Sequence, residues 1–219
     1  MVWTLTDDEA TLDEAEVSAS ISTSNPEDGL QVRADSGVLS LFGFQSSGPL
    51  VESYVRNPDL ICRYAARDSD GVQHTSYMRA LQDGCGLELL LSVQTSQLHS
   101  CPESWVRFAM EPGGLVTPDG NDPNNTCKSP TFHEFLLVRP NNRPGTTWGF
   151  FSPPGDVHEV QWNLDDKLRL SFSVFPHSLE KGVIRRVRFL FYSLGRGNDL
   201  AEASRISRAL LAETPPLTT

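Results

Sequence analysis

Strict alternation of apolar and polar residues is the feature that most constrains how this 219-residue chain can fold. The stretch KLRLSFSVF, residues 167–175, has an apolar side chain at every second position and charged or hydroxyl side chains between them. Because successive side chains of a strand point to opposite faces of a sheet, this pattern predicts a strand with one buried and one solvent-facing side. The side chains predicted to face inward are Leu168, Leu170, Phe172 and Val174.

The same alternation recurs along the chain and predicts further half-buried strands at 17–21, 87–93, 105–110 and 183–191. Turn-forming residues separate such segments. Asp68-Ser69-Asp70-Gly71 lies between two strand-like arms within 61–81, and Asp35-Ser36-Gly37 lies within 30–44. Glycine can adopt the backbone conformation that closes a short loop, so both stretches are predicted to be antiparallel hairpins.

The two ends of the chain differ from this pattern. Residues 198–213 place Leu200, Ala203, Ile206, Leu210 and Leu211 on one stripe, which predicts a helix with Asn198 or Asp199 as its N-cap. We expect this helix to cover an end or an open edge of the sheet. Residues 1–16 form an acidic N-terminal lead, with six acids between positions 7 and 16, and are predicted to be either a solvated helix or an unstructured segment.

Many short strands without alternating helices or internal repeats favour an all-β fold. We predict one domain spanning residues 1–219, built as a two-sheet antiparallel β-sandwich or a jelly-roll-like fold, with the C-terminal α-helix packed on it. A distorted barrel is the alternative.

Charge and hydropathy exclude several classes of partner. The formal charge of −10 repels nucleic acid and anionic membranes, so neither is predicted as a partner. Arg185, Arg186 and Arg188 form a local basic cluster, which we interpret as the solvated face of a strand. The chain has no apolar run of about 18 residues and no signal-peptide pattern at its start, which favours a cytoplasmic location. Secretion stays open, because a removed leader would leave no trace.

The stretch TPDGNDPNNTC, residues 117–127, contains hard oxygen ligands of the kind that calcium prefers. The candidate metal ligands are Asp119, Asn121 and Asp122. Pro123 and the absence of a glycine at the sharp turn break the EF-hand pattern, and the same residue types form turns without any ion. We therefore predict a turn and no cofactor, with calcium or another divalent metal as the alternative.

Two similar tetrapeptides, FHEF and VHEV, provide His133, Glu134 and His158 as candidate site residues. Neither has the second histidine of a zinc-protease helix. Side chains adjacent in a strand point apart, so a site would need convergence across strands, with His177 or Asp156 as a third partner. The alternative is that these histidines are ordinary surface residues.

The most aromatic stretch of the chain, residues 146–163, contains Trp148, Phe151 and Trp162 together with Asp156 and His158. Flat aromatic rings beside polar groups suit the apolar face and polar edge of a sugar ring. These residues are therefore the candidate ligand-binding patch. The alternative is that the aromatic side chains belong to the core.

The chain contains no nucleophile elbow, phosphate-binding loop or dinucleotide motif. Our functional hypothesis is a non-catalytic β-sandwich module that binds a carbohydrate or a protein partner. The alternatives are a hydrolase or metal-dependent enzyme that uses the histidine and acid cluster, and a structural subunit that assembles with itself.

Overall fold

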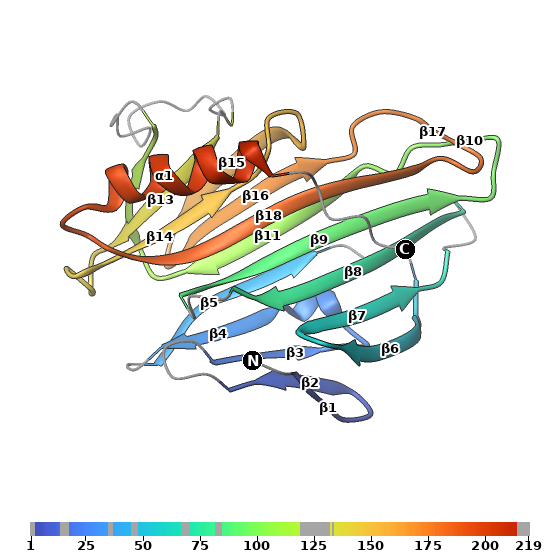
Figure 1. Ribbon diagram of the computed structural model, residues 1–219, viewed down its shortest axis with the longest axis horizontal. Coiled ribbons are helices and arrows are strands. Elements are labelled where there is room, and N and C mark those ends of the chain that lie inside the picture. The colour runs from blue at the N-terminus through green and yellow to red at the C-terminus, as the bar shows by residue number, and fades with distance from the viewer. Residues whose placement is uncertain are drawn as a thin grey trace.

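The computed structural model describes residues 3–13, 18–34, 37–44, 48–66, 71–81, 85–118, 132 and 134–213, with only the backbone for 33, 34 and 37–42. Within this part of the chain, two eight-stranded antiparallel sheets lie face to face, with one short ribbon and one helix (Figure 1). The predicted all-β fold with a C-terminal helix is confirmed. No helix among these residues is both long and apolar enough to span a bilayer.

The first sheet contains the N-terminal strands and three later ones. Its strands, in spatial order, are β1 (Thr4–Leu5), β2 (Glu9–Leu12), β3 (Ser18–Ser22), β4 (Leu30–Ala34), β5 (Gly37–Phe44), β11 (Ser104–Met110), β16 (Leu168–Val174) and β15 (Val157–Leu164). A 3-10 turn, η1 (Pro26–Asp28), connects β3 to β4. The strand predicted from KLRLSFSVF is thus β16, which pairs with β11 and β15.

The second sheet carries the helix and the candidate site. Its strands, in spatial order, are β12 (Gly113–Val116), β13 (Phe135–Pro140), β14 (Thr146–Phe151), β18 (Ile184–Gly195), β9 (Gly86–Thr95), β8 (Val72–Ala80), β7 (Asp59–Tyr64) and β6 (Leu50–Arg56). A separate two-stranded ribbon pairs β10 (His99–Ser100) with β17 (Leu179–Glu180).

The inward faces of the two sheets form one hydrophobic core. The four residues predicted to face inward on β16 are all buried there, as are the alternating residues of β9. Phe108 on β11 contacts the ring of Phe150 on β14 edge-to-face, with ring centroids 4.5 Å apart. The period-two pattern therefore identified the buried side of these strands correctly.

Both predicted hairpins form as antiparallel pairs, β4 with β5 and β7 with β8. Gly71, just before β8, has a φ of 62°, a left-handed conformation that glycine adopts more readily than other residues. Asn57 has a similar φ of 55° in the two-residue turn between β6 and β7. Asparagine tolerates this region better than most residues, so it can close this short turn.

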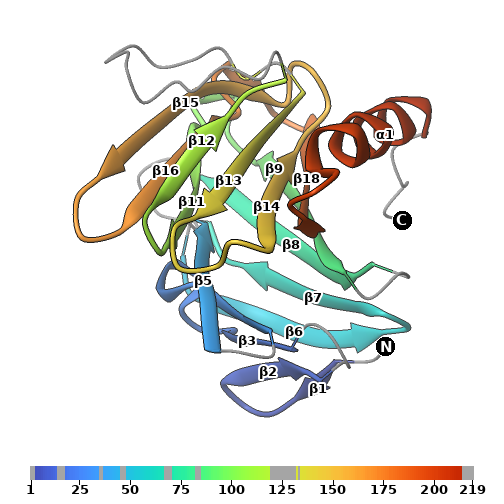
Figure 2. The same ribbon diagram turned by 90° about the vertical axis from the view of Figure 1, so that its left-hand side faces the viewer.

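The helix α1 (Asp199–Ala212) packs on a face of the second sheet, whereas we expected it at an end or an edge (Figure 2). The reason is that β13, β14 and β18 are apolar on both sides. Their outward side chains pack with α1 in a second hydrophobic cluster made of Val116, Phe135, Leu137, Phe151, Leu190, Leu194, Ala203, Ile206 and Leu210. The helix therefore buries a layer of the sheet that would otherwise face water.

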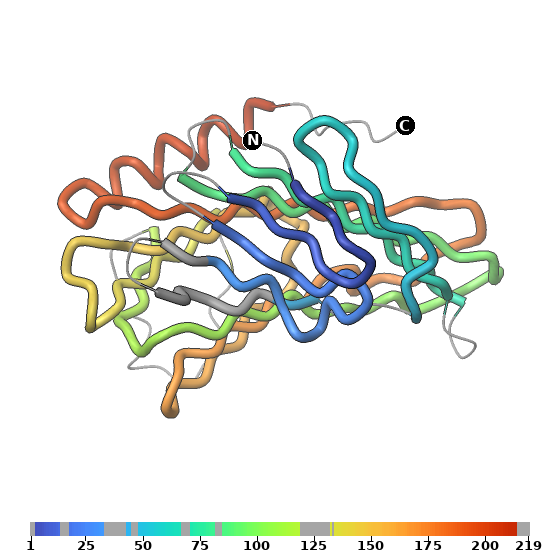
Figure 3. Tube along the Cα trace, turned by 90° about the horizontal axis from the view of Figure 1, so that it is seen from below, coloured from blue at the N-terminus to red at the C-terminus, as the bar shows by residue number. Residues whose placement is uncertain are grey.

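The described part of the acidic N-terminal lead, residues 3–13, contains two short strands and no helix. Residues 9–12 form strand β2, in which Ala10 and Leu12 are buried and the acid at position 9 is exposed. Trp3 donates its indole N–H to the backbone oxygen of Met78 on β8, at 3.1 Å. The hairpin β1–β2 lies beside β6 (Figures 1 and 3), so the start of the chain closes one edge of the sandwich.

Candidate functional site

The outward face of the second sheet is divided into two halves by α1. The covered face consists of the outward side chains of β12–β14 and of residues 190–194 of β18, and it lies under the helix. The open face consists of the outward side chains of β6–β9 and of residues 184–188 of β18. Figure 2 shows these strands continuing the sheet beyond the helix. Helix packing thus leaves the open face as the accessible part of the sheet.

Strand register aligns the side chains of the open face in rows that cross five strands. Counted from Ile184 at the start of β18, the second outward row is here called the hydroxyl row. It contains Glu52, Arg63, Thr75, Ser92 and Arg186. The next one, here called the tyrosine row, contains Tyr54, Ile61, Tyr77, Leu90 and Arg188. Neighbouring strands lie about 4.8 Å apart, so directly opposite side chains touch.

A third row, here called the ion-pair row, borders the helix. It contains Arg56, Asp59, Arg79, Glu88 and Leu190. The side chain of Arg79 binds Asp59 through two hydrogen bonds of 2.6 and 3.0 Å, and it lies 3.8 Å from Glu88. The hydrogen bonds to Asp59 raise the pKa of the Arg79 guanidinium.

Arg188 connects this row to the end of the helix. Its guanidinium binds the Glu88 carboxylate, which is only 6% exposed, and it lies 2.9 Å from the carboxylate of Glu213, just after α1. Buried charges need such partners to offset desolvation. The border between the covered and open faces is therefore a network of ion pairs.

A groove of about 220 Å³ lies on the open face away from that network. It is lined by the whole hydroxyl row together with Tyr54, Ile61, Tyr77, Gln94 and Ile184. The amide of Gln94 donates to the side chain of Gln73 at 2.9 Å, and Glu52 pairs with Arg63 at 3.2 Å. The groove combines aromatic rings, hydroxyls, an amide and charged groups, which is the mixture that orients a polar small molecule.

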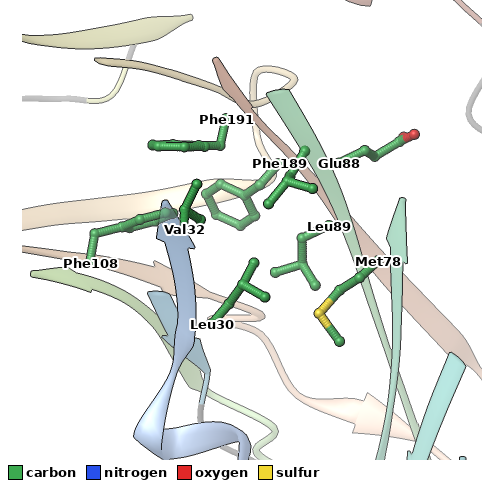
Figure 4. A pocket seen from close by; sticks show the side chains of 9 residues that line it. Leu30, Val32, Met78, Glu88, Leu89, Phe108, Phe189 and Phe191 are labelled. Carbon is green, nitrogen blue, oxygen red and sulfur yellow. The ribbon is translucent and has the colours of Figure 1, made fainter. Parts of the chain in front are cut away.

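Two other hollows are poorer candidates. A cavity of about 20 Å³ between the sheets is lined by apolar side chains, while the side chain of Glu88 extends away from it (Figure 4). That space holds little more than one water molecule. A groove of about 240 Å³ on the first sheet is charged, through Glu27, Arg107 and Arg169, but its two aromatic residues are buried.

The predicted aromatic patch does not form, because two of its three rings lie in the interior. Trp148 is 1% exposed and packs against Phe191 in the main core, and Phe151 is 0% exposed under α1. Trp162 is half-buried on β15 and packs against the same core. Neither Trp148 nor Phe151 can offer a ring face to a ligand, which corrects that interpretation.

The polar members of the predicted site are separated from one another. Asp156 is half-buried and accepts the backbone N–H of Arg188 at 2.8 Å; burial raises the pKa of its carboxyl to about 6. Glu134 accepts a hydrogen bond from Ser207 on α1 at 3.0 Å. His158 is exposed, and its ring centroid lies 6.5 Å from that of His177. The fold thus places two of the predicted histidines near each other. Among the described residues, no third side chain joins them to form a metal site.

Other candidate residues lie outside the described residues. These are His133 and the proposed metal ligands Asp119, Asn121 and Asp122. Within the described part of the chain, no group of three or more histidine, cysteine, aspartate or glutamate side chains is arranged to hold a metal ion.

Sequence reasoning missed most of the groove. Two features of the sequence could have indicated it. One is the alternation of residues 72–80, which leaves Thr75 and Tyr77 facing outward, and the other is the basic cluster that contains Arg186. We interpreted that cluster as a solvated strand face. Arg186 does lie on an outward face, but it also lines the groove.

No protein-family model matches this chain, and no curated protein matches it by sequence. Solved structures do share its fold. A candidate aldose 1-epimerase from Escherichia coli K12 aligns with a TM-score of 0.61 at 8% identity, covering 84% of this chain and 98% of that one. A candidate aldose 1-epimerase from Klebsiella pneumoniae gives 0.59 at 8% identity, covering 96% and 87%. A galactose mutarotase related enzyme from Lactobacillus acidophilus gives 0.55 at 7% identity, covering 85% and 97%.

These comparisons correct the functional hypothesis. We predicted a non-catalytic binding module, but these three structures, which share the fold along most of their length, are described as epimerase- and mutarotase-type enzymes. At identities of 7–8% the likeness establishes the fold alone. The chain has the β-sandwich architecture of aldose epimerase-like proteins.

Proposed function

We propose that this protein is a carbohydrate-processing enzyme that interconverts the anomers of a sugar, with its substrate bound in the groove on the open face. One observation carries the proposal: the uncovered half of the second sheet holds a groove that combines two tyrosines with a carboxylate and hydroxyl groups. The fold shared with proteins described as aldose 1-epimerases supports it.

The reaction needs only two proton-transferring groups and no co-reactant. A base takes the proton of the C1 hydroxyl while the bond between C1 and the ring oxygen breaks, and an acid gives a proton to that oxygen. The resulting open-chain aldehyde rotates about the bond between C1 and C2. Ring closure then reverses both proton transfers, so atoms and charges balance.

The groove contains candidates for both roles. Glu52 is its single carboxylate among the lining residues, with a half-exposed side chain, and Tyr54 and Tyr77 are its phenols. We assign Glu52 as the base and Tyr77 as the acid, because Tyr77 lies in the middle of the open face, on β8 between β7 and β9. The rings of Tyr54 and Tyr77 also provide apolar surface for a sugar ring.

The test is the rate at which a freshly dissolved pure anomer approaches equilibrium, followed by polarimetry or NMR for a panel of aldoses. We expect the purified protein to accelerate exchange above the buffer rate for at least one sugar. Glu52→Gln and Tyr77→Phe should each lower kcat by about 10²–10⁴-fold, the usual contribution of a positioned acid or base.

Matched controls lie outside the groove. Asp165→Asn removes a carboxylate that is similarly exposed and similarly paired with an arginine on the first sheet, and Tyr192→Phe removes a hydroxyl on the covered face. Both should leave kcat unchanged. Exchange at the buffer rate for every sugar tested would contradict the proposal, as would equal losses in the controls.

A further inference from the structure

The charge of the open face opposes that of the whole protein. The chain carries a formal charge of −10. The open face has five arginines, at positions 56, 63, 79, 186 and 188, against three carboxylates, at positions 52, 59 and 88. A positive region on an acidic protein attracts anions locally, since charged clefts concentrate ligands of opposite sign.

Four of these arginines fall into two groups. Those of the ion-pair border, Arg79 and Arg188, are held by buried or part-buried carboxylates at short distances. Those that line the groove are Arg63 and Arg186, and the one carboxylate among the lining residues, Glu52, pairs with Arg63. The Arg63–Glu52 pair is about half exposed on both sides, and exposed pairs of this kind contribute little. The lining residues therefore carry one more positive than negative charge.

The hydroxyl row places these two arginines on either side of short side chains. Arg63 on β7 and Arg186 on β18 are separated by Thr75 on β8 and Ser92 on β9. Two short residues leave space above the sheet between two long ones. Their hydroxyls can donate to an oxyanion, and guanidinium groups bind carboxylate and phosphate oxygens through paired hydrogen bonds.

We propose that the groove binds an anionic sugar, with the negative group held between Arg63 and Arg186 above Thr75 and Ser92 and the sugar ring against Tyr54 and Tyr77. This inference rests on the proposed function and specifies its substrate class. The groove of about 220 Å³ is smaller than the ~300–1,000 Å³ of sites for drug-sized ligands, which favours a monosaccharide over a polymer.

Calorimetric titration measures binding independently of turnover. The probes are glucose, glucuronate, glucose 6-phosphate and inorganic phosphate, which separate a neutral sugar, a carboxylate, a phosphate ester and a free anion. We expect one of the charged sugars to bind at least tenfold more tightly than glucose, and its Kd to rise with salt as that of glucose stays constant. Which charged sugar binds identifies the anionic group.

Variants locate the site. Arg63→Gln and Arg186→Gln should each weaken binding of the charged sugar at least tenfold more than binding of glucose. Arg63→Lys and Arg186→Lys, which keep the charge but lose the planar fork, should retain part of the preference for the charged sugar. The control is Arg169→Gln on β16, which removes an arginine of similar exposure that also pairs with one carboxylate.

The outcomes separate the two proposals. Equal affinity for neutral and charged sugars, or an equal loss in Arg169→Gln, would overturn the anionic substrate even if anomer exchange is catalysed. Tight, Arg63-dependent binding of a charged sugar without any anomer exchange would support the anion site and overturn the proposed reaction. Phosphate binding with no added affinity from the sugar would overturn the assignment of a sugar substrate.

Discussion

The covered and open faces of the second sheet are continuous halves of one surface with opposite chemistry. From Leu190 onward, the outward side chains of β18, β14 and β13 are apolar or aromatic apart from Thr147 and Arg139, and they lie under α1. Before Leu190, most outward positions are polar, among them arginines, carboxylates, tyrosines and hydroxyls. The comparison shows that the second sheet has a core side, which packs on the first sheet, and an outward side, of which one half is covered by α1 and the other half is exposed.

The two halves also use ion pairs differently. On the covered face, Asp199 at the start of α1 is 3% exposed and accepts hydrogen bonds from Arg139, at 2.9 and 3.0 Å, and from Thr147, at 2.7 Å. Although burial opposes it, these bonds hold the pKa of Asp199 below its usual value. In the groove, Arg63 and Glu52 form a single, half-exposed pair. The first arrangement anchors an element, and the second leaves its groups accessible.

The largest effect should come from removing the anchor of the helix. We expect Asp199→Ala to reduce the free energy of unfolding by about 3 kcal/mol, because Arg139 loses its partner in a partly buried position. Urea unfolding followed by circular dichroism measures this. Asp165→Asn, at an exposed pair, should cost less than about 1 kcal/mol. Equal losses would show that α1 does not depend on this contact.

The next largest effect is expected from the buried side chains of α1. Ile206→Ala should cost about 2–3 kcal/mol, near the lower end for buried isoleucine, because a surface helix can shift into part of the space. Leu211→Ala on the exposed side of α1 should change stability by less than about 0.5 kcal/mol. If both variants lose the same stability, the helix does not pack as described.

A smaller effect is expected at Asp156, which accepts a hydrogen bond from the backbone of Arg188 on β18, the strand that belongs to both faces. The pKa of Asp156 is raised from 3.8 to about 6, so the folded state holds its proton more tightly than the unfolded state. Stability from this group is therefore present at low pH and is lost as pH rises from about 4 to 6. We expect the free energy of unfolding of the wild type, relative to Asp156→Asn, to fall by about 1–2 kcal/mol over that window, a range that allows for partial exposure.

Asparagine keeps an oxygen that can accept the backbone N–H of Arg188, so this variant should fold. Thermal unfolding of both proteins at several pH values between 3.5 and 7 provides the measurement. A difference that is constant with pH, or one that grows in favour of the wild type above pH 6, would contradict the assignment.

The smallest effect is expected in the groove itself. A double-mutant cycle of Glu52→Gln and Arg63→Gln should give a coupling energy of about 0.2–1 kcal/mol, decreasing in 1 M salt. A coupling above about 2 kcal/mol would mean that this pair is structural, and the contrast with the covered face would disappear.

Sequence alone predicted the strands whose two sides differ in polarity. β9 and β16 alternate clearly, and their inward residues are buried as expected. β14 was misinterpreted because both of its sides are buried, with Trp148 and Phe150 in the main core and Phe151 under α1. A strand buried on both sides reads as a continuous apolar run, so periodicity cannot assign its faces.

The groove could not be predicted for a different reason. Its residues come from five strands, and the pair of strands that joins Arg188 to Glu88 brings together positions 100 residues apart in the sequence. Local alternation shows that Tyr77 faces away from the core, but it does not show that Arg63 and Arg186 share a row with Thr75 and Ser92. That information lies in the pairing of strands distant in sequence.

Strand β18 has twelve residues and runs continuously from the groove to the loop before α1. Side chains along a strand alternate with a period of two, so one inserted or deleted residue reverses the faces of every residue beyond it. A change of length within residues 184–188 would shift Arg186 out of the groove or move Leu190 and Leu194 out of contact with the helix. An insertion or deletion in β18 would therefore disturb the groove or the helix contact, whereas single substitutions on the open face change the groove without shifting the strand.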